Sequence, residues 1–426
     1  MGDAQVFWRT ASYNMDLAAF SRKFVADTRG TQVGTPFYGI FSPGTVSPNA
    51  GWAAAWSDAG VIVPWTSWLQ TGDTTIIEQN WEAMTKYLDA VAAENPDFLW
   101  KNDYGQPFGD WLSPEGKTDE VLIASAYWAY DATLMQQMAR ATGRTQEADK
   151  YAQLFERVRA AFQKQFVHAD GFVAGADNSA SQFGVINNPN AKSSGGDTQT
   201  GYVLALHMNL LPENLRSAAA KRLVDKIHVN HDLLGTGFLG TPYLLEELTK
   251  AGYANLAYTL LLDTRYPSWG YMVKHGATTM WERWNGDQML NDPSMNSFNH
   301  YAYGAVAEWM YRDAAGIDAT PLDPGFHTVV LHPVFDARLG HLSFDYDSAY
   351  GPIHSDWTVT GSTAEWHLTI PPNTSGWLPL NADEAARYTL DGAPLVKSRD
   401  ASAGSLGGSS GFRLAPGSYR FLVQLS

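Results

Sequence analysis

Apolar residues recur with the spacing of amphipathic helices up to about residue 316. Trp81, Met84, Leu88 and Val91, for example, fall on one face of a helix over residues 75–94. The same spacing predicts eleven helices, over residues 4–15, 15–28, 52–70, 75–94, 120–142, 145–167, 198–210, 213–229, 241–251, 253–263 and 297–314. Gly143 and Gly252 follow two of them directly, as expected of residues in the left-handed conformation that ends a helix.

The hydrophobic period changes to two after residues 316–321. Trp366, Leu368 and Ile370 alternate with polar residues, and the last residues of the chain repeat this alternation. Gly, Pro, Asn and Ser separate these stretches. The pattern predicts a small antiparallel β-sandwich over residues 319–426, with the Gly- and Ser-rich residues 403–411 as a flexible turn within it.

Pairs of antiparallel helices joined by alternating short and long loops favour an (α/α)6 barrel, so the chain is predicted to be mainly α. Residues 1–318 would form this barrel, with a cleft lined by the long loops. Such a barrel has six inner and six outer helices, and the eleven predicted here are one short. We therefore expect the barrel to be incomplete at its N-terminus.

Composition narrows the classes of partner. The 426 residues, 45% of them hydrophobic, can bury a sizeable core in one large and one smaller domain. The net charge of −15 and the lack of a basic run argue against nucleic acid, because phosphate contacts need clustered Lys and Arg. A neutral or polar glycan is the easier partner.

The chain carries no cysteine, which excludes disulfides, thiol chemistry and cysteine-based zinc sites without choosing a compartment. No apolar run reaches the roughly 18 residues that a membrane span needs, so no membrane association is expected. Met1 is followed by Gly2 and Asp3 and not by the basic and apolar stretches of a signal peptide. This start favours a cytoplasmic location for the chain, and it leaves the compartment of a longer parent protein open.

The densest chemical signal lies in residues 278–286, where Glu282 stands between Trp281 and Trp284 and beside Arg283. Indole faces stack on the C–H face of a pyranose, and a partly dehydrated carboxylate can activate a water molecule. The alternative is a buried cluster in which Glu282 and Arg283 form an ion pair without chemistry.

Two neighbouring motifs favour the sugar interpretation. YPSWGY occupies residues 266–271, and NSFNHYAYG occupies residues 296–304. With the segment around Glu282, these motifs resemble the bacterial α-L-rhamnosidases, glycoside hydrolase family seventy-eight. Further matches, spread over nearly the whole chain, are residues 1–7, 56–59, 108–112 and 237–241.

The resemblance implies inverting hydrolysis of terminal α-L-rhamnosyl residues from a glycoside or oligosaccharide. Glycoside hydrolysis usually needs two carboxyl groups, one as acid and one as base or nucleophile. Glu282 occupies the position of the general base in this family. The resemblance also assigns substrate contacts to five residues, which are Asp3, Trp56, Asp110, Trp111 and His300.

Each of those five residues also has a purely structural interpretation. Asp3 and Asp110 could cap a helix or a turn, Trp56 and Trp111 could be core residues, and His300 could be a hydrogen-bonded core histidine. No cofactor or metal is expected, because neither a calcium loop nor an HExxH pattern is present in the sequence.

Residues 2–5 resemble the end of a longer family motif, D-E-R-x-G-W-x-G-D-A-Q, whose glutamate is the general acid. Everything before x-G-D-A-Q would lie upstream of Met1. We therefore expect that the N-terminal domains of a parent chain are missing and that acid catalysis is impaired. The alternatives are a rhamnose-binding remnant without activity, or another (α/α)6 glycosidase that acts on glucosides.

Overall fold

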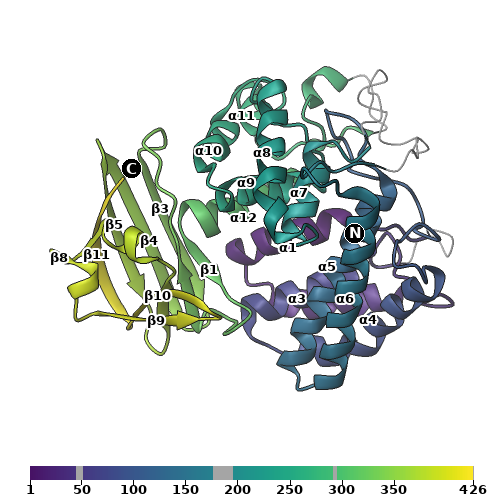
Figure 1. Ribbon diagram of the computed structural model, residues 1–426, viewed down its shortest axis with the longest axis horizontal. Helices are drawn as coiled ribbons and strands as arrows, with labels where there is room; N and C mark the ends of the chain where they lie inside the picture. The colour runs from purple at the N-terminus through teal and green to yellow at the C-terminus, as the bar shows by residue number, and fades with distance from the viewer. Residues whose placement is uncertain (45–50, 176–194, 291–294, 426) are drawn as a thin grey trace. The chain divides into compact units, whose positions relative to one another are not determined.

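A computed structural model describes residues 1–44, 51–175, 195–290 and 295–425. Two compact units are present (Figure 1). One contains Met1–Trp8, Ala18–Trp65 and Thr74–Val306, and the other contains Arg9–Leu17, Thr66–Asp73 and Ala307–Ser426. The predicted domain boundary between residues 318 and 319 stays a prediction. Among the described residues, no helix has the length and apolar character to cross a membrane.

Helices succeed one another in antiparallel pairs, as the sequence predicts, and α5–α6, α7–α8 and α9–α10 pack against each other. In chain order the α-helices are α1 (Gly2–Asn14), α2 (Ala18–Gly30), α3 (Ala59–Thr71), α4 (Thr75–Glu94), α5 (Glu120–Ala141), α6 (Thr145–Phe166), α7 (Gln199–His207), α8 (Glu213–Val229), α9 (Thr241–Lys250), α10 (Ala254–Leu262), α11 (Trp269–Lys274), α12 (Val306–Trp309) and, between strands of the second unit, α13 (Ala382–Ala385).

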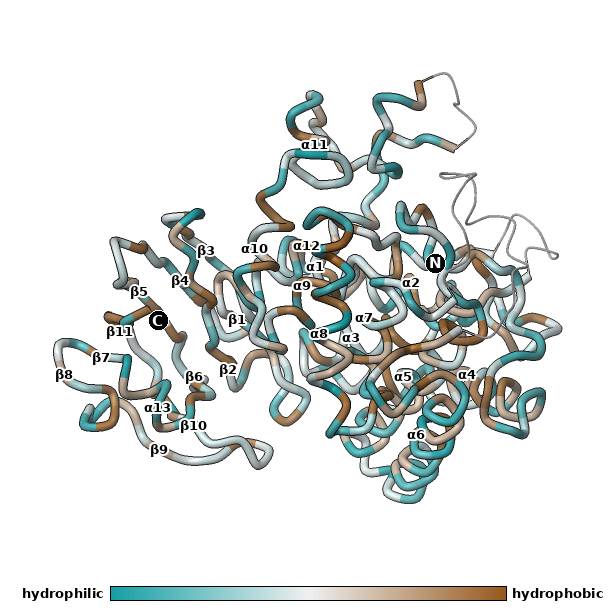
Figure 2. The backbone as a smooth tube through the Cα atoms, turned by 45° about the horizontal axis from the view of Figure 1, so that its top comes forward, coloured by the Kyte–Doolittle hydropathy of each residue, from teal (hydrophilic) through white to brown (hydrophobic). Residues whose placement is uncertain are grey.

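The pair α5 and α6 illustrates inner and outer helices. Asp119 begins α5 by accepting a hydrogen bond from the Leu122 amide at 2.8 Å, and most of this helix is buried. In α6 only one face is buried, and hydrophilic residues cover much of the rest (Figure 2). A helix that is apolar on nearly every side has to lie inside the unit.

The helix predictions were wrong in three places. Residues 52–58, predicted as helix, form a tight turn before α3, and α11 was not predicted. The helix predicted over residues 297–314 starts only at a 3₁₀ turn, Ala302–Ala305, because the backbone of residues 297–300 is hydrogen-bonded to residues 280–282 instead.

The second unit contains a β-sandwich of two sheets, with strand orders β1-β2-β6-β10-β9 and β3-β4-β5-β11-β7-β8. The strands are β1 (Ile317–Ala319), β2 (Thr328–Leu331), β3 (His341–Ser348), β4 (Gly351–Thr360), β5 (Thr363–Ile370), β6 (Ser375–Leu378), β7 (Tyr388–Leu390), β8 (Ala393–Pro394), β9 (Ala401–Leu406), β10 (Ser409–Leu414) and β11 (Gly417–Gln424). Only β2 and β6 pair in parallel among the described strands. The sheets meet closely at Gly376, where a Cβ atom would lie 2.6 Å from Ile370 Cδ1.

The turn predicted for residues 403–411 is shorter than predicted. These residues belong to the hairpin of β9 and β10. Gly407 and Gly408, with φ of 59° and 89°, connect the strands, and two residues of positive φ suit the twist of a two-residue hairpin loop. The glycines therefore make a specific turn.

Candidate active site

Glu282 lies on a short backbone pairing in the helical unit. Its amide donates to the Ser297 carbonyl at 2.8 Å, and the Ser297 amide donates to Glu282 Oε2 at 2.9 Å. The side chain is half-buried. Oε1 makes no hydrogen bond within the described part of the chain, so the carboxylate is anchored through one oxygen while the other remains available.

The residues that flank Glu282 pack into the core. Trp284 is 2% exposed and stacks on Tyr303 with ring centroids 3.8 Å apart, while Trp281 is 5% exposed. These two indoles therefore do not offer a sugar-stacking face. Arg283 donates from Nε to the Met295 carbonyl at 2.7 Å, and no ion pair joins it to Glu282 among the described residues.

His300 follows on the same backbone pairing and contacts Asp3. The His300 amide donates to the Met280 carbonyl at 2.8 Å, and its Nε2 lies 3.1 Å from Asp3 Oδ1. Asp3 is in the first turn of α1, where the helix dipole favours a negative charge. Both side chains are partly exposed, at 23% and 25%, so each can still reach a ligand.

Trp56 packs directly over the start of α1. A Cβ atom at Gly2 would lie 2.5 Å from the Trp56 ring, so only glycine permits this approach. Phe108 continues the aromatic surface, with ring centroids 4.9 Å from Trp56 and 5.9 Å from Trp111. Trp56 is 7% exposed and Trp111 is half-buried.

Asp110 connects two loops. Its carboxylate accepts from the Thr200 hydroxyl and from the amides of Gly237, Leu239 and Gly240, the last three at 2.7, 2.7 and 3.2 Å. Burial raises the pKa of Asp110, while these hydrogen bonds oppose the shift. The bonds agree with the interpretation of a turn aspartate, and a substrate contact for Asp110 stays a prediction.

Aromatic and polar contacts make four of the predicted residues members of one ring of neighbours. The Phe238 ring lies 5.1 Å from the His300 ring, and the Phe238 amide donates to the Trp111 carbonyl at 3.0 Å. The ring consists of Asp3, His300, Phe238, Trp111, Phe108 and Trp56, and we call it the site ring. Glu282 joins it through the backbone pairing, and Asp110 lies behind it.

Sequence reasoning missed Phe108 as a candidate wall residue and Phe238 as the buried ring that packs against His300. Both lie inside motifs that the sequence analysis singled out, which was the available signal. Their partners are distant in the chain, so only the folded structure shows which aromatic rings of a motif meet His300 or Trp56.

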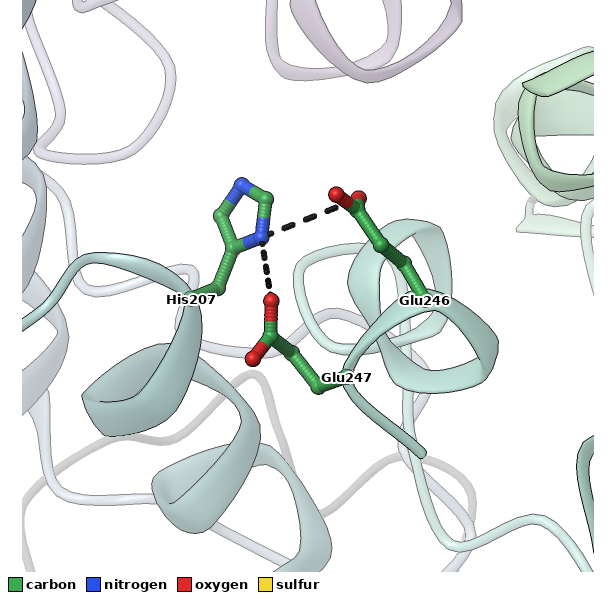
Figure 3. Close-up of side chains that lie close together, drawn as sticks. All are labelled: His207, Glu246 and Glu247. Carbon is green, nitrogen blue, oxygen red and sulfur yellow. Dashed lines mark hydrogen bonds and ion pairs between the residues drawn. The ribbon is translucent and has the colours of Figure 1, made fainter. Parts of the chain in front are cut away.

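One cluster of described residues has the ligand types of a metal site. His207 Nδ1 lies 3.1 Å from Glu247 Oε1 and 3.8 Å from Glu246 Oε2 (Figure 3). However, Lys250 Nζ lies 2.6 Å from Glu246 and 3.0 Å from Glu247. Its ammonium already compensates the carboxylates, so the cluster is explained as a charge network between α7 and α9.

Comparison with known proteins relates the whole chain to one group of enzymes. Residues 1–314 match the bacterial α-L-rhamnosidase six-hairpin glycosidase domain, and residues 316–392 match the bacterial α-L-rhamnosidase C-terminal domain. An α-L-rhamnosidase of Streptomyces avermitilis is 36% identical over 99% of this chain and 38% of its own length. One from Formosa agariphila is 34% identical over 92% of this chain and 40% of its own length.

The crystal structure of the Streptomyces avermitilis α-L-rhamnosidase complexed with L-rhamnose is similar throughout. It aligns with a TM-score of 0.85 and 35% identity over 99% of this chain and 38% of that one. The predicted helical barrel followed by a β-sandwich is thereby confirmed. The chain spans about two fifths of the length of these relatives.

Proposed function

Because the chain belongs to the bacterial α-L-rhamnosidase family with a six-hairpin glycosidase domain, we propose that it acts in the inverting hydrolysis of terminal α-L-rhamnosyl residues. The observation that carries this proposal is the placement of Glu282. One of its oxygens is held by the Ser297 amide and the other is open, next to a ring of polar and aromatic side chains.

Glu282 is the general base. Oε1 accepts a proton from the water that attacks the anomeric carbon, while the bond from Ser297 to Oε2 keeps the carboxylate plane fixed. Holding the base in a set orientation lowers the entropic part of the barrier. The departing glycosidic oxygen also needs a proton, which a separate acid has to supply.

The site ring binds the sugar. Asp3 and His300 offer acceptors and donors to the rhamnose hydroxyls, and their mutual contact sets which atoms face the ligand. Trp111 and Phe108, which are half-buried, supply apolar contact for the C–H face and the C6 methyl group together with the exposed part of Trp56. Phe238, 2% exposed, packs against His300 instead. The relative that was crystallised with L-rhamnose supports rhamnose as the ligand.

The experiment is the hydrolysis of dinitrophenyl α-L-rhamnoside by the Glu282→Gln variant. Loss of the base should lower kcat by about 10²–10⁴-fold, with rhamnose binding retained in calorimetry. The matched control is Asp287→Asn, which changes a carboxylate that accepts a hydrogen bond from the Tyr271 hydroxyl. This variant should leave kcat unchanged. Near-normal turnover by Glu282→Gln would exclude Glu282 as the base.

A second substrate tests for the general acid, a role that we assign to no described residue. An alkyl leaving group needs a proton from an acid, whereas dinitrophenolate leaves without one. If the acid is absent, the alkyl rhamnoside should therefore lose a further factor of about 10²–10⁴ in rate, in addition to the difference in intrinsic reactivity between the two substrates. No excess loss would reveal an acid within the 426 residues. Rhamnose binding without turnover of either substrate would favour a binding role, and turnover of aryl glucosides instead would favour another (α/α)6 glycosidase.

A further inference from the structure

A pair of buried carboxyl groups lies beside the Trp56 turn and has no part in the proposed chemistry. Asp58, which directly precedes α3, is 0% exposed, and Asp131, in the middle of α5, is 1% exposed. Their side chains are hydrogen-bonded to each other. Because ionised carboxylates only accept hydrogen bonds, this contact needs a proton on one of the two.

The surroundings indicate which carboxyl group holds the proton. Asp58 Oδ2 accepts from the Ala55 amide at 2.6 Å, which favours the ionised form of Asp58. The Tyr87 hydroxyl is a second donor to Asp58, whereas Oδ1 of Asp131 receives no hydrogen bond from an amide or a hydroxyl in the described part of the chain. A proton on Asp131 that is donated to Asp58 pairs the two carboxyl groups.

Electrostatics agree with one shared proton. Burial raises the pKa of both carboxyls, and the charge of Asp58 raises that of Asp131 further. The titratable groups that face the pair are the phenols of Tyr38, Tyr87 and Tyr127. No lysine, arginine or histidine among the described residues forms an ion pair with either aspartate.

The pair supports the turn that presents Trp56. Ala55 has a φ of +64°, a left-handed conformation that a residue with a Cβ atom adopts only when its surroundings enforce it. The Ala55 amide is held by Asp58, and its carbonyl accepts from Gln5 Nε2 of α1 at 2.5 Å. Trp56 then packs over Gly2, next to Asp3 of the site ring.

We propose that Asp131 is a positioning residue for sugar binding: its carboxylic acid donates to Asp58, and Asp58 holds the Ala55–Trp56 turn against the start of α1. The proposal rests on the function proposed above, because Trp56 is taken as part of the rhamnose site. Neither aspartate touches the sugar.

Two variants of Asp131 separate positioning from mere stability. Asp131→Asn keeps a donor toward Asp58 but cannot ionise, whereas Asp131→Leu keeps the volume and removes the donor. Calorimetry with L-rhamnose should give a Kd that is unchanged for the Asn variant and raised by roughly tenfold for the Leu variant. A Leu variant that melts earlier but binds rhamnose normally would show a purely structural role and would overturn the proposal.

A readout at Trp56 keeps this test independent of activity. In protein labelled with 5-fluorotryptophan, the ¹⁹F signal of Trp56 is assigned by its disappearance in Trp56→Phe. The Asn variant should keep the wild-type signal, and the Leu variant should shift or broaden it. Absence of rhamnose binding in the wild type would count against the proposed function alone, whereas an unshifted Trp56 signal in the Leu variant would count against positioning.

The pH dependence supplies a third measurement, which uses only well-folded proteins. Because the folded pKa values are raised, the native pair holds more protons than the unfolded chain above the unfolded pKa of about 4, so its contribution to stability falls as pH rises. Asp131→Asn lacks this loss. Its Tm relative to wild type should therefore increase between pH 5 and pH 9, and parallel Tm curves would overturn the shared proton.

Discussion

At the level of single residues, two aspartates from recognisable motifs have different environments. Asp3 is partly exposed and its side chain contacts His300, so it can still bind a ligand. Asp110 is 5% exposed and accepts four hydrogen bonds from Thr200 and the turn at residues 237–240. Placement in a motif therefore identifies a candidate aspartate without saying whether it serves the ligand or the fold.

Asp110→Asn should destabilise the helical unit. The amide group of asparagine puts a donor where the carboxylate accepts, so at least one buried N–H loses its partner, at a cost of about 1–3 kcal/mol. The free energy of unfolding in urea measures this effect. Asp170→Asn, at an exposed carboxylate paired with Arg222, is the control and should change little. Equal stability of the Asp110 variant and wild type would contradict the role of a loop-joining carboxylate.

At the level of elements, periodicity predicted helices wherever one face packs into the core, and it failed where hydrogen bonds decide the backbone. The start of α3 is delayed by the turn around Ala55, and α11 is a short helix whose first turn depends on Ser268. Ser268 is 0% exposed, and its hydroxyl oxygen accepts from the Tyr271 amide at 2.9 Å. A helix of six residues gains little from propagation, so its cap matters.

Ser268→Ala should therefore cost about 1 kcal/mol of stability and lower amide protection in α11. Hydrogen exchange followed by mass spectrometry gives the local effect. Thr74→Ala is the matched control, because Thr74 precedes α4 without a side-chain cap bond among the described residues. If both variants exchange like wild type in residues 268–274, the cap is not what holds α11.

At the level of the whole molecule, the sandwich unit is assembled from three separate stretches of chain. Tyr13 belongs to the first of them. Its hydroxyl donates to the Ile317 carbonyl at 2.9 Å, and its ring lies against Phe326, Phe344 and Tyr346. Residues near the N-terminus therefore stabilise a unit whose strands come more than 300 residues later.

Tyr13→Ala should destabilise that unit by about 3–5 kcal/mol, since it removes a large buried ring together with its hydrogen bond. Exchange protection should fall in β1 and β3 as well as around residue 13. Tyr350→Ala, at a residue 40% exposed, should stay within about 0.5 kcal/mol of wild type. Unchanged protection of β1 and β3 in the Tyr13 variant would show that the sandwich is stable without this stretch.

The sequence alone determined the helical order, the change to strands near residue 317 and the motifs that carry Glu282 and His300, because periodicity and motifs depend on residues close together in the chain. Only the tertiary structure decided which of those residues meet. The contact of Asp3 with His300, the donors gathered by Asp110 and the pairing of Asp58 with Asp131 join residues from 73 to 297 positions apart. Such contacts depend on how the helices pack, which no local pattern records, and the open oxygen of Glu282 follows from the same packing.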